Sequence, residues 1–308
     1  MNQNDGKGFA KMSKLKFQDP DIKDKRLKLM LWGVWGAGKT TAAIQFPNAA
    51  IIDTEHSTDE YMATIKASGS KVLHTNDVDE IQGQILTLLS EPHDYKTLII
   101  DSWTIVYEAI QEKWERKFIQ YAKDDKSRDM QDFGFRYWGR VKAENKALMR
   151  LLHRLDMNVI LTCREKDKYE GDGNNQKKTG VQADGARGDL YDMTYSFHLE
   201  KRGDQRIAVL SKQRAEMNKP TFPDEFIWTY DNFLKFYGKE TIERKATPVK
   251  LATAEQIIEL NRLVEMGLLD EEKVEKSLKK AEAEDFSQIS EKFADSLIDY
   301  CKEKVSPK

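Results

Sequence analysis

The sequence predicts an α/β fold, in which a mostly parallel, twisted sheet is flanked by helices and a small helical region follows at the C-terminal end. Four short apolar segments have the length and composition of strands, at residues 27–32, 48–52, 95–102 and 157–162. Amphipathic helical patterns separate them along the chain. Alternation of buried strands with helices is typical of an α/β domain.

The first strand leads into a glycine-rich motif. Residues 33–40 read Gly-Val-Trp-Gly-Ala-Gly-Lys-Thr, a complete G-x-x-x-x-G-K-[ST] phosphate loop, and a helix is expected from Lys39 to Pro47. In such a loop, backbone N–H groups and the positive end of the helix dipole point at phosphate oxygens. Lys39 is expected to reach the β- and γ-phosphates, and the Thr40 hydroxyl to ligate Mg²⁺. A glycine-rich turn that binds nothing is the alternative, and it is disfavoured because the motif and both flanks agree.

The motif predicts a nucleoside-triphosphate site with Mg²⁺ as the metal. The residues expected to contact the nucleotide there are Gly33, Trp35, Gly36, Ala37, Gly38, Lys39, Thr40 and Thr41.

Two acidic residues are expected beside this loop. Glu55 follows the strand at 48–52, and Asp101 lies at the end of the strand at 95–102. Ligands of a doubly wound sheet lie outside the carboxyl ends of its strands, so Lys39, Glu55 and Asp101 should converge on one crevice. Asp101 is expected to hold Mg²⁺ through water, and Glu55 to orient and deprotonate the attacking water. The alternatives are a strand-terminal turn acid for Asp101 and an acid near a helix N-cap for Glu55.

The order of elements resembles that of the RecA-like recombinase ATPases, in particular the short, core-only RecA-like proteins of bacteriophages that act in single-strand annealing and recombination. The resemblance covers roughly residues 8–240. It rests on the phosphate loop, on Ile-Ile-Asp-Thr-Glu-His at 51–56 and on Leu-Ile-Ile-Asp-Ser at 98–102. It implies a RecA-like P-loop fold, makes Glu55 the catalytic glutamate and supports the role of Asp101.

The same resemblance implies further contacts and partners. It places Asp59 near the adenine ring, and Tyr61 lies one residue earlier than the tyrosine that stacks on adenine in the family. It implies a DNA-dependent ATPase that binds single-stranded DNA, promotes annealing or strand pairing, and forms a homo-oligomer or filament with ATP at the subunit interface. A single-strand-binding protein is a further expected partner. Lys212 and Arg214, after a strand at 206–211, resemble the cations that reach the neighbouring subunit's ATP. The alternative is that both are solvated residues at a strand end.

The strand at 157–162 ends in Cys163-Arg164-Glu165, where related ATPases keep a polar residue that senses the γ-phosphate. Arg164 stands in place of the familiar glutamine. It either senses the phosphate by its charge or is the first solvated residue of a loop. Residues 165–188 contain five glycines among lysines and asparagines, and a long loop is expected there. In the resembling family this region touches DNA, and an ordinary solvated loop is the alternative. The expected DNA-binding residues are Lys166, Lys168, Tyr169, Lys177, Lys178 and Arg187.

Composition divides the 308 residues into four parts. Residues 1–26 are polar and lysine-rich, which predicts a flexible arm in which Phe9 anchors a neighbouring subunit. Residues 27–240 are expected to form the ATPase core and 241–252 a charged linker. Residues 253–308 are expected to form a helical domain, used either for partner docking and self-association or as a stabilising cap.

Composition also limits the compartment and the function. Two cysteines indicate no disulfide framework, and the polar first 26 residues resemble neither a signal peptide nor a membrane anchor, so the cytoplasm is expected, the host's for a phage protein. With a net charge of −2, a nucleic-acid site must be a local basic patch. One rival is a nucleotide or small-molecule kinase, which needs an arginine-bearing lid, and residues 165–188 contain one arginine. The other is a nucleotide-gated binding or scaffold protein that hydrolyses ATP weakly.

Overall fold

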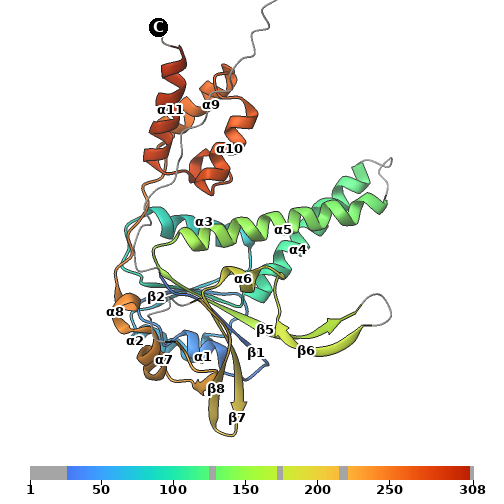
Figure 1. Cartoon of the computed structure of the whole chain (residues 1–308), viewed down its shortest axis with the longest axis vertical. Helices are drawn as coiled ribbons and strands as arrows, with labels where there is room; N and C mark the ends of the chain where they lie inside the picture. The colour runs from blue at the N-terminus through green and yellow to red at the C-terminus, as the bar shows by residue number, and fades with distance from the viewer. Residues whose placement is uncertain (1–25, 125–129, 172–175, 215–220, 306–308) are drawn as a thin grey trace, which may run out of the picture.

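The structure, a computed structural model, describes residues 26–124, 130–171, 176–214 and 221–305. It confirms the predicted fold class, because a mostly parallel mixed sheet lies between two layers of helices and a group of helices follows at the C-terminal end (Figure 1). The expected arm at 1–26, including Phe9, lies outside the described residues except for Arg26. None of the described helices is both long enough and apolar enough to cross a membrane.

The sheet of the described residues has nine strands. They span Lys28–Gly33 (β1), Ala49–Asp53 (β2), Lys71–His74 (β3), Thr97–Asp101 (β4), Asn158–Glu170 (β5), Lys177–Ala183 (β6), Tyr195–Arg202 (β7), Gln205–Gln213 (β8) and Glu225–Ile227 (β9). Their order across the sheet is β3-β2-β4-β5-β1-β7-β8-β9, and β6 pairs with β5. The first six strands of this order are parallel, whereas β8 runs antiparallel to both of its neighbours, β7 and β9. The carboxyl ends of β1, β2, β4 and β5 therefore meet at one edge.

Helices cover both faces of this sheet. They span Lys39–Ala43 (α1), Met62–Ala67 (α2), Val78–Ser90 (α3), Trp103–Asp124 (α4), Met130–Arg154 (α5), Asp189–Asp192 (α6), Tyr230–Tyr237 (α7), Lys239–Glu243 (α8), Ala254–Glu265 (α9), Glu271–Ala281 (α10) and Glu291–Val305 (α11), with 3-10 turns at Asp59–Tyr61 (η1) and Phe286–Gln288 (η3). The helix expected from Lys39 to Pro47 thus ends at Ala43.

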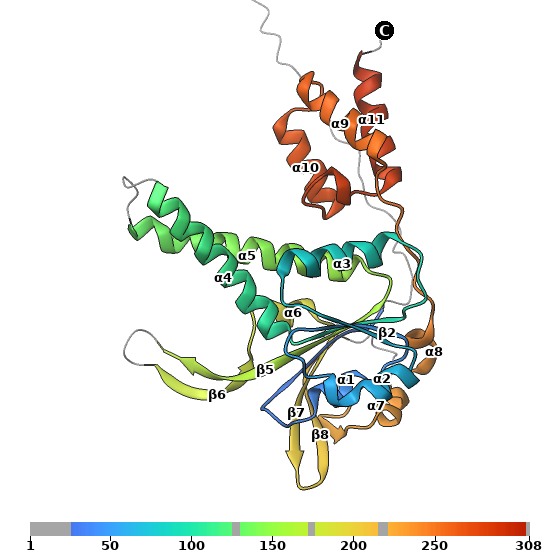
Figure 2. The same cartoon turned by 180° about the vertical axis from the view of Figure 1, so that it is seen from behind.

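Alternate residues of β1 point to opposite faces of the sheet, because side chains alternate along a strand. Leu29 and Leu31 belong to the apolar core shared with α1, α2 and α7, whereas Met30 and Trp32 belong to the core shared with α3, α4 and α5. Figure 2 shows the two layers from behind. This double burial holds β1 rigidly, and β1 leads directly into the phosphate loop.

The prediction of a long loop at 165–188 is wrong, because most of that stretch forms a β-hairpin. Strand β5 continues beyond the sheet to Glu170 and pairs with β6, with Glu165 opposite Ala183. Charged residues of the two strands face each other, and Lys178 forms an ion pair of 2.6 Å with Asp167. The hairpin projects from the body beside the ends of α4 and α5 (Figure 1). Residues 167–170 of β5 are exposed, so this polar end of the strand does not have to enter an apolar core.

The C-terminal helices have an apolar core of their own, built mainly from α9 and α11. The stretch expected as a linker, 241–252, starts inside packed structure, since Ile242 of α8 is fully buried against the second face of the sheet. Arg26 also fixes this stretch by donating to the carbonyl oxygens of Thr241 and Arg244, at 3.3 and 2.7 Å. The chain then reaches the C-terminal helices, where Arg154 of α5 donates to the carbonyl oxygen of Gln288 at 2.5 Å.

A buried lysine lies at the opposite edge of the sheet, where β1 begins. Lys28, the first residue of β1, donates from Nζ to the carbonyl oxygens of Leu152, Leu155 and Met157, at 2.7, 3.0 and 3.1 Å. These carbonyls belong to the last turn of α5 and the segment after it. All three donors of the ammonium group are used in this way, so one side chain fixes the end of α5 against the central strand.

We expect Lys28→Met to lower the free energy of unfolding by about 1–3 kcal/mol, because three carbonyl groups lose their buried donor. Urea denaturation followed by circular dichroism measures this change. The matched control is Lys71→Met, which replaces an exposed lysine of β3 and should stay within about 0.5 kcal/mol. Equal stability of the two variants would contradict the structural role of Lys28.

Candidate functional site

The phosphate loop between β1 and α1 depends on glycine at several positions, including Gly36 and Gly38. Gly36 and Gly38 have positive φ angles of 76° and 92°, a region that L-residues with side chains rarely adopt. A side chain at Gly38 would also collide with the guanidinium group of Arg206, which lies at the start of β8. The loop backbone is therefore free to wrap around an anion, with a cation of the β7–β8 hairpin beside it.

Lys39 begins α1 and folds back over this loop. Its Nζ donates to the carbonyl oxygens of Gly33 and Val34, each at 3.0 Å. Burial lowers the pKa of Lys39, while the carboxylates of Asp101 and Glu55 act in the opposite direction. The other expected nucleotide contacts lie in the same loop or in the first turn of α1, namely Gly33, Trp35, Gly36, Ala37, Gly38, Thr40 and Thr41.

Asp101, at the end of β4, receives three hydroxyl donors from three different elements. Thr40 of α1 and Ser57 of the turn after β2 donate to Oδ2 at 2.6 and 2.8 Å, and Thr162 of β5 donates to Oδ1. Hydroxyl and carboxylate oxygens are the ligands that Mg²⁺ prefers. Thr40 and Asp101 thus lie together, in a donor set that fits the metal expected from the sequence, and they would hold it beside the phosphates.

Glu55 lies at the same edge of the sheet and has two partners. Arg164 of β5 forms an ion pair with Oε2, with 2.9 Å between Nη2 and the oxygen, and the Ser102 hydroxyl donates to Oε1. The hydrogen bond to Glu55 raises the pKa of Arg164. Of the two roles considered for Arg164, the structure supports neither directly. Instead, this guanidinium group is paired with Glu55, the expected general base.

The turn that carries Glu55 is built around the buried carboxylate of Asp53. This carboxylate accepts from the backbone N–H groups of Glu55, Ser57 and Thr58, at 3.1, 3.1 and 2.9 Å, and from the Thr58 hydroxyl at 2.6 Å. Burial acts to raise the pKa of Asp53, but these hydrogen bonds outweigh it and hold the pKa below its ordinary value. Glu55 therefore has a fixed backbone.

A family model described as an AAA domain matches residues 25–219, more than half of the chain. The chain belongs to the AAA domain family. This match and the phosphate loop make residues 25–219 a nucleotide-binding P-loop ATPase domain. No match to a curated protein was found.

Two residues expected at the adenine ring lie at the rim of the AAA domain. Asp59 begins η1 and faces two histidines, His56 and His74, across 3.8 and 3.6 Å. Tyr61 ends the same 3-10 turn and is half-buried against the core under α1. Neither residue contacts the phosphate loop through a hydrogen bond or ion pair found among the described residues.

The two cations expected to act on a neighbouring subunit lie far from Lys39 within one chain. Strand β8 runs antiparallel to β7, so it starts beside the phosphate loop and ends at the opposite edge of the sheet. There Lys212 donates to the carbonyl oxygens of Leu190 and Tyr191, at 2.7 and 2.6 Å, and Arg214 donates to that of Tyr191 at 2.8 Å. Neither cation can reach the nucleotide site of its own chain.

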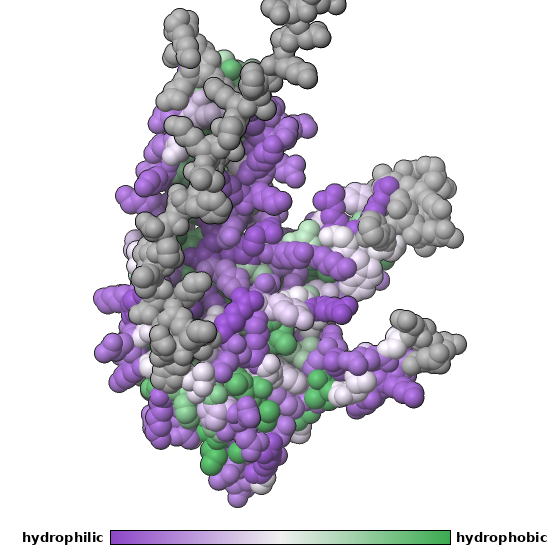
Figure 3. All heavy atoms as spheres, viewed as in Figure 1, coloured by the Kyte–Doolittle hydropathy of each residue, from purple (hydrophilic) through white to green (hydrophobic). Residues whose placement is uncertain are grey.

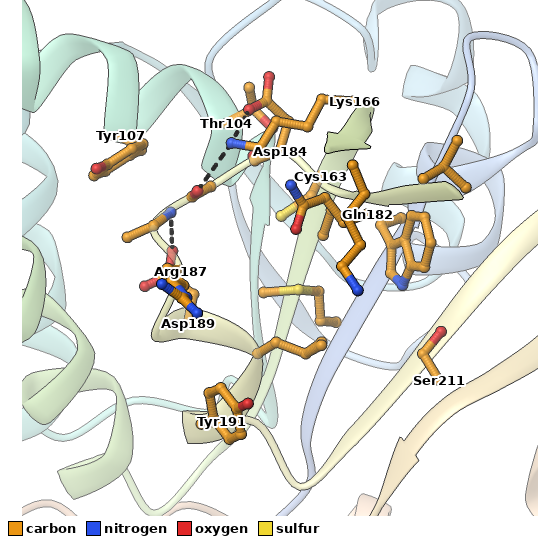
Figure 4. Close-up of a pocket in the computed structure, with 18 of the residues that line it drawn as sticks. Thr104, Tyr107, Cys163, Lys166, Gln182, Asp184, Arg187, Asp189, Tyr191 and Ser211 are labelled. Carbon is orange, nitrogen blue, oxygen red and sulfur yellow. Dashed lines mark hydrogen bonds and ion pairs between the residues drawn. The ribbon is translucent and has the colours of Figure 1, made fainter. Parts of the chain in front are cut away.

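A groove of about 1090 Å³ lies beside the nucleotide site of the AAA domain, between the β5–β6 hairpin, α4, α5 and α6 (Figure 4). Figure 3 shows the surface hollowed between the two projecting arms, the hairpin and the α4–α5 pair. Four of the six expected DNA-binding residues line this groove, namely Lys166, Lys168, Tyr169 and Arg187. The other two, Lys177 and Lys178, lie on β6 outside it.

The groove combines charged walls with a buried acidic residue at its base. Lys166 pairs with Asp184 at 2.9 Å, and Lys168 pairs with Glu170 at 2.7 Å. Below them, Asp189 accepts from Trp103 Nε1 at 2.8 Å, from the Asn145 side chain at 2.7 Å and from the Ala186 N–H at 2.9 Å. Burial raises the pKa of Asp189, although these donors oppose the shift. Asp189 thus organises the floor of the groove.

Sequence reasoning missed four polar residues of the nucleotide site. Three of them lie at or after the end of a buried strand, and a polar side chain after an apolar run could have indicated them. Nothing in the sequence indicated the fourth, Arg206, because the position of its strand in the sheet was not known. The four are Ser57, Ser102, Thr162 and Arg206.

We expect Glu55→Gln to lower the rate of ATP hydrolysis by about 10²–10⁴-fold, because the amide cannot accept a proton from water. Binding of a fluorescent ATP analogue should be retained. Steady-state phosphate release and analogue titration measure the two effects.

Two further variants make this test specific. Lys39→Ala should lose nucleotide binding itself, since it removes the cation over the loop, and Glu60→Gln, which changes an exposed acid of η1, should behave like the unchanged protein. Full hydrolysis by the Glu55 variant would exclude Glu55 as the base.

Proposed function

We propose that this AAA domain is a RecA-like, ATP- and Mg²⁺-dependent ATPase that binds single-stranded DNA and promotes annealing or strand pairing in phage recombination. The observation that best supports the proposal is that strand β5 contributes residues to both the nucleotide site and the groove. Within a few residues, this strand holds the expected general base through Arg164 and lines the groove through Lys166 and Lys168. A ligand in the groove therefore contacts the same strand as the catalytic centre.

The chemistry of the groove suits a single strand of nucleic acid. Tyr107, Trp138, Tyr169 and Tyr191 are aromatic lining residues, and stacking on such rings contributes about 1–3 kcal/mol per base without regard to sequence. The phosphate backbone would contact the lining cations. Arg187 is exposed and has no ion pair with another described residue, so its charge is available. In a chain with a net charge of −2, such a local patch is the form a DNA site must take.

Hydrolysis in this arrangement depends on releasing Glu55. As long as Arg164 and Ser102 occupy both carboxylate oxygens, Glu55 is a poor base for water. A strand of DNA that draws the β5–β6 hairpin toward it would shift Arg164 and free the carboxylate. The same contacts support the second candidate, a nucleotide-gated DNA-binding or scaffold protein in which Glu55 stays paired and hydrolysis is weak.

ATP hydrolysis measured with and without single-stranded DNA tests the proposal. We expect stimulation by DNA. Stimulation by a small phosphoryl acceptor instead would identify a nucleotide kinase, and ATP-dependent DNA binding without stimulated hydrolysis would favour the gated binding protein.

The groove is tested by the salt dependence of DNA binding. A Lys168→Ala, Arg187→Ala double variant should bind single-stranded DNA more weakly, and each lost phosphate contact should lower the slope of log affinity against log salt by about 0.7. The matched control is a Lys177→Ala, Lys178→Ala variant, which removes two cations from the same hairpin outside the groove. A slope that falls only in the control would place DNA on the outer face of β6.

The proposal includes a homo-oligomer or filament with ATP at the subunit interface, and a single-strand-binding protein as a further partner. The side chain of Trp35, in the middle of the phosphate loop, is 96% exposed. An indole is a large apolar group that commonly anchors interfaces. This exposure supports a neighbouring subunit that covers the loop and brings Lys212 and Arg214 to its ATP.

Mixing two inactive variants tests this assembly. Lys39→Ala lacks nucleotide binding and Arg214→Ala lacks the reaching cation, so a mixed interface can pair an intact loop with an intact cation. We expect the mixture to recover part of the ATPase activity. Full activity of Arg214→Ala alone, at concentrations where the protein is monomeric, would contradict action between subunits.

A further inference from the structure

Two histidines and an aspartate meet at the outer rim of the nucleotide site, and the catalytic arrangement described above makes no use of the histidines. The imidazole rings of His56 and His74 are stacked, with 4.4 Å between their centroids and 10° between their planes. Asp59 faces both of them, with Oδ2 3.8 Å from Nδ1 of His56 and Oδ1 3.6 Å from Nε2 of His74. One potential ligand atom from each residue lies within 4.8 Å of the other two.

A buried carboxylate lies near one ring nitrogen of His74, just beyond hydrogen-bonding distance. His74 ends β3, directly opposite Asp53 of β2, and its Nδ1 lies 3.6 Å from the Oδ2 atom of that buried carboxylate. A carboxylate behind one ring nitrogen orients the imidazole and leaves the other nitrogen to bind a metal. For His74, the remaining nitrogen is Nε2, which faces Asp59.

The other two side chains have the freedom to complete a site. The side chains of His56 and Asp59 are 67% and 56% exposed, and neither forms a hydrogen bond or ion pair outside this cluster with a described residue. Ligands of a tetrahedral zinc ion lie about 2.0–2.1 Å from the metal and hence roughly 3.3 Å from one another. Because the two imidazole rings are stacked, metal binding requires the exposed side chains of His56 and Asp59 to rotate, and their exposure leaves room for that rotation.

We propose that His56, Asp59 and His74 bind a divalent transition-metal ion, for which Zn²⁺ is the best match, separate from the Mg²⁺ expected at Thr40 and Asp101. Two imidazole nitrogens and one carboxylate oxygen are a donor set typical of zinc, whereas Mg²⁺ prefers oxygen ligands throughout. Water or a group from a bound molecule would fill the fourth position.

The position of the site gives it a consequence for the catalytic turn. His56 follows Glu55 directly in the chain, and Asp59 begins η1, so a metal ion would tie this turn to β3 at its open side. The turn would then be held from inside by Asp53 and from outside by the metal. The proposal stands on these contacts alone and does not depend on the DNA-binding function.

Zinc binding is measured on the full chain, free of nucleotide and of any histidine tag, by titration calorimetry with ZnCl₂ and by competition with a chromophoric zinc indicator. We expect one equivalent to bind. The background is low, because both cysteines are buried and no other group of three histidine, cysteine or acidic side chains close enough to hold a metal was found among the described residues. An ion pair cluster that needs no metal is the alternative, and in that case the unchanged protein would bind no zinc.

Two ligand variants and one control locate the ion. His74→Gln and His56→Asn should each weaken zinc binding by at least the roughly 10–100-fold that loss of an outer-shell partner costs. Asparagine is chosen for position 56 because the φ angle of His56 is +56°, a conformation that asparagine tolerates. His153→Gln, on α5, should bind zinc as the unchanged protein does. Thermal unfolding without zinc confirms that the variants are folded, and equal zinc affinity in all of them would overturn the proposal.

Discussion

The catalytic edge of this molecule depends on one buried carboxylate, that of Asp53. Placing a charge in the interior is unfavourable unless hydrogen bonds replace its lost hydration, and here donors from Glu55, Ser57 and Thr58 supply them. Each donor that satisfies Asp53 also fixes one residue of the following turn. Ser57 extends the network to Asp101, and through it to Thr40 of the phosphate loop. A single acidic group thus positions the expected general base and connects it to the pair expected to bind the metal.

Strand β5 provides the second organising element. In its buried half, Thr162 donates a hydrogen bond to Asp101. Just beyond it, the exposed Arg164 forms an ion pair with Glu55, and the outer half of the strand then leaves the sheet and forms one wall of the groove. The outer half pairs with β6 alone, but it continues directly from the half that is paired on both sides, so a displacement of the outer half acts on the residues at the sheet edge. The groove and the catalytic centre are in this sense two ends of one element.

Much of the fold followed from the sequence because buried parallel strands require unbroken apolar runs, such as Leu98–Ile100, and these are visible without a structure. The convergence of Lys39, Glu55 and Asp101 was predicted because ligands of a doubly wound sheet lie at the carboxyl ends of its strands. The hairpin could not be predicted in this way, because the outer half of β5 consists almost entirely of charged residues and lacks the apolar face by which strands are recognised. The positions of Arg206 and Lys212 depend on β7 pairing in parallel with β1, which places the start of β8 beside the phosphate loop and its end at the far edge. Strand order is a property of tertiary packing, and a single sequence does not encode it in any local pattern.

The distribution of the six tryptophans makes the two sites optically distinct. Trp32, Trp103 and Trp228 are buried and Trp114 is partly buried, whereas Trp35 in the phosphate loop and Trp138 at the groove are 96% and 44% exposed. A soluble collisional quencher reaches exposed indoles and not buried ones. The quenchable part of the intrinsic fluorescence therefore comes largely from the two places where ligands are expected, and replacing either exposed tryptophan by phenylalanine leaves a natural reporter at the other.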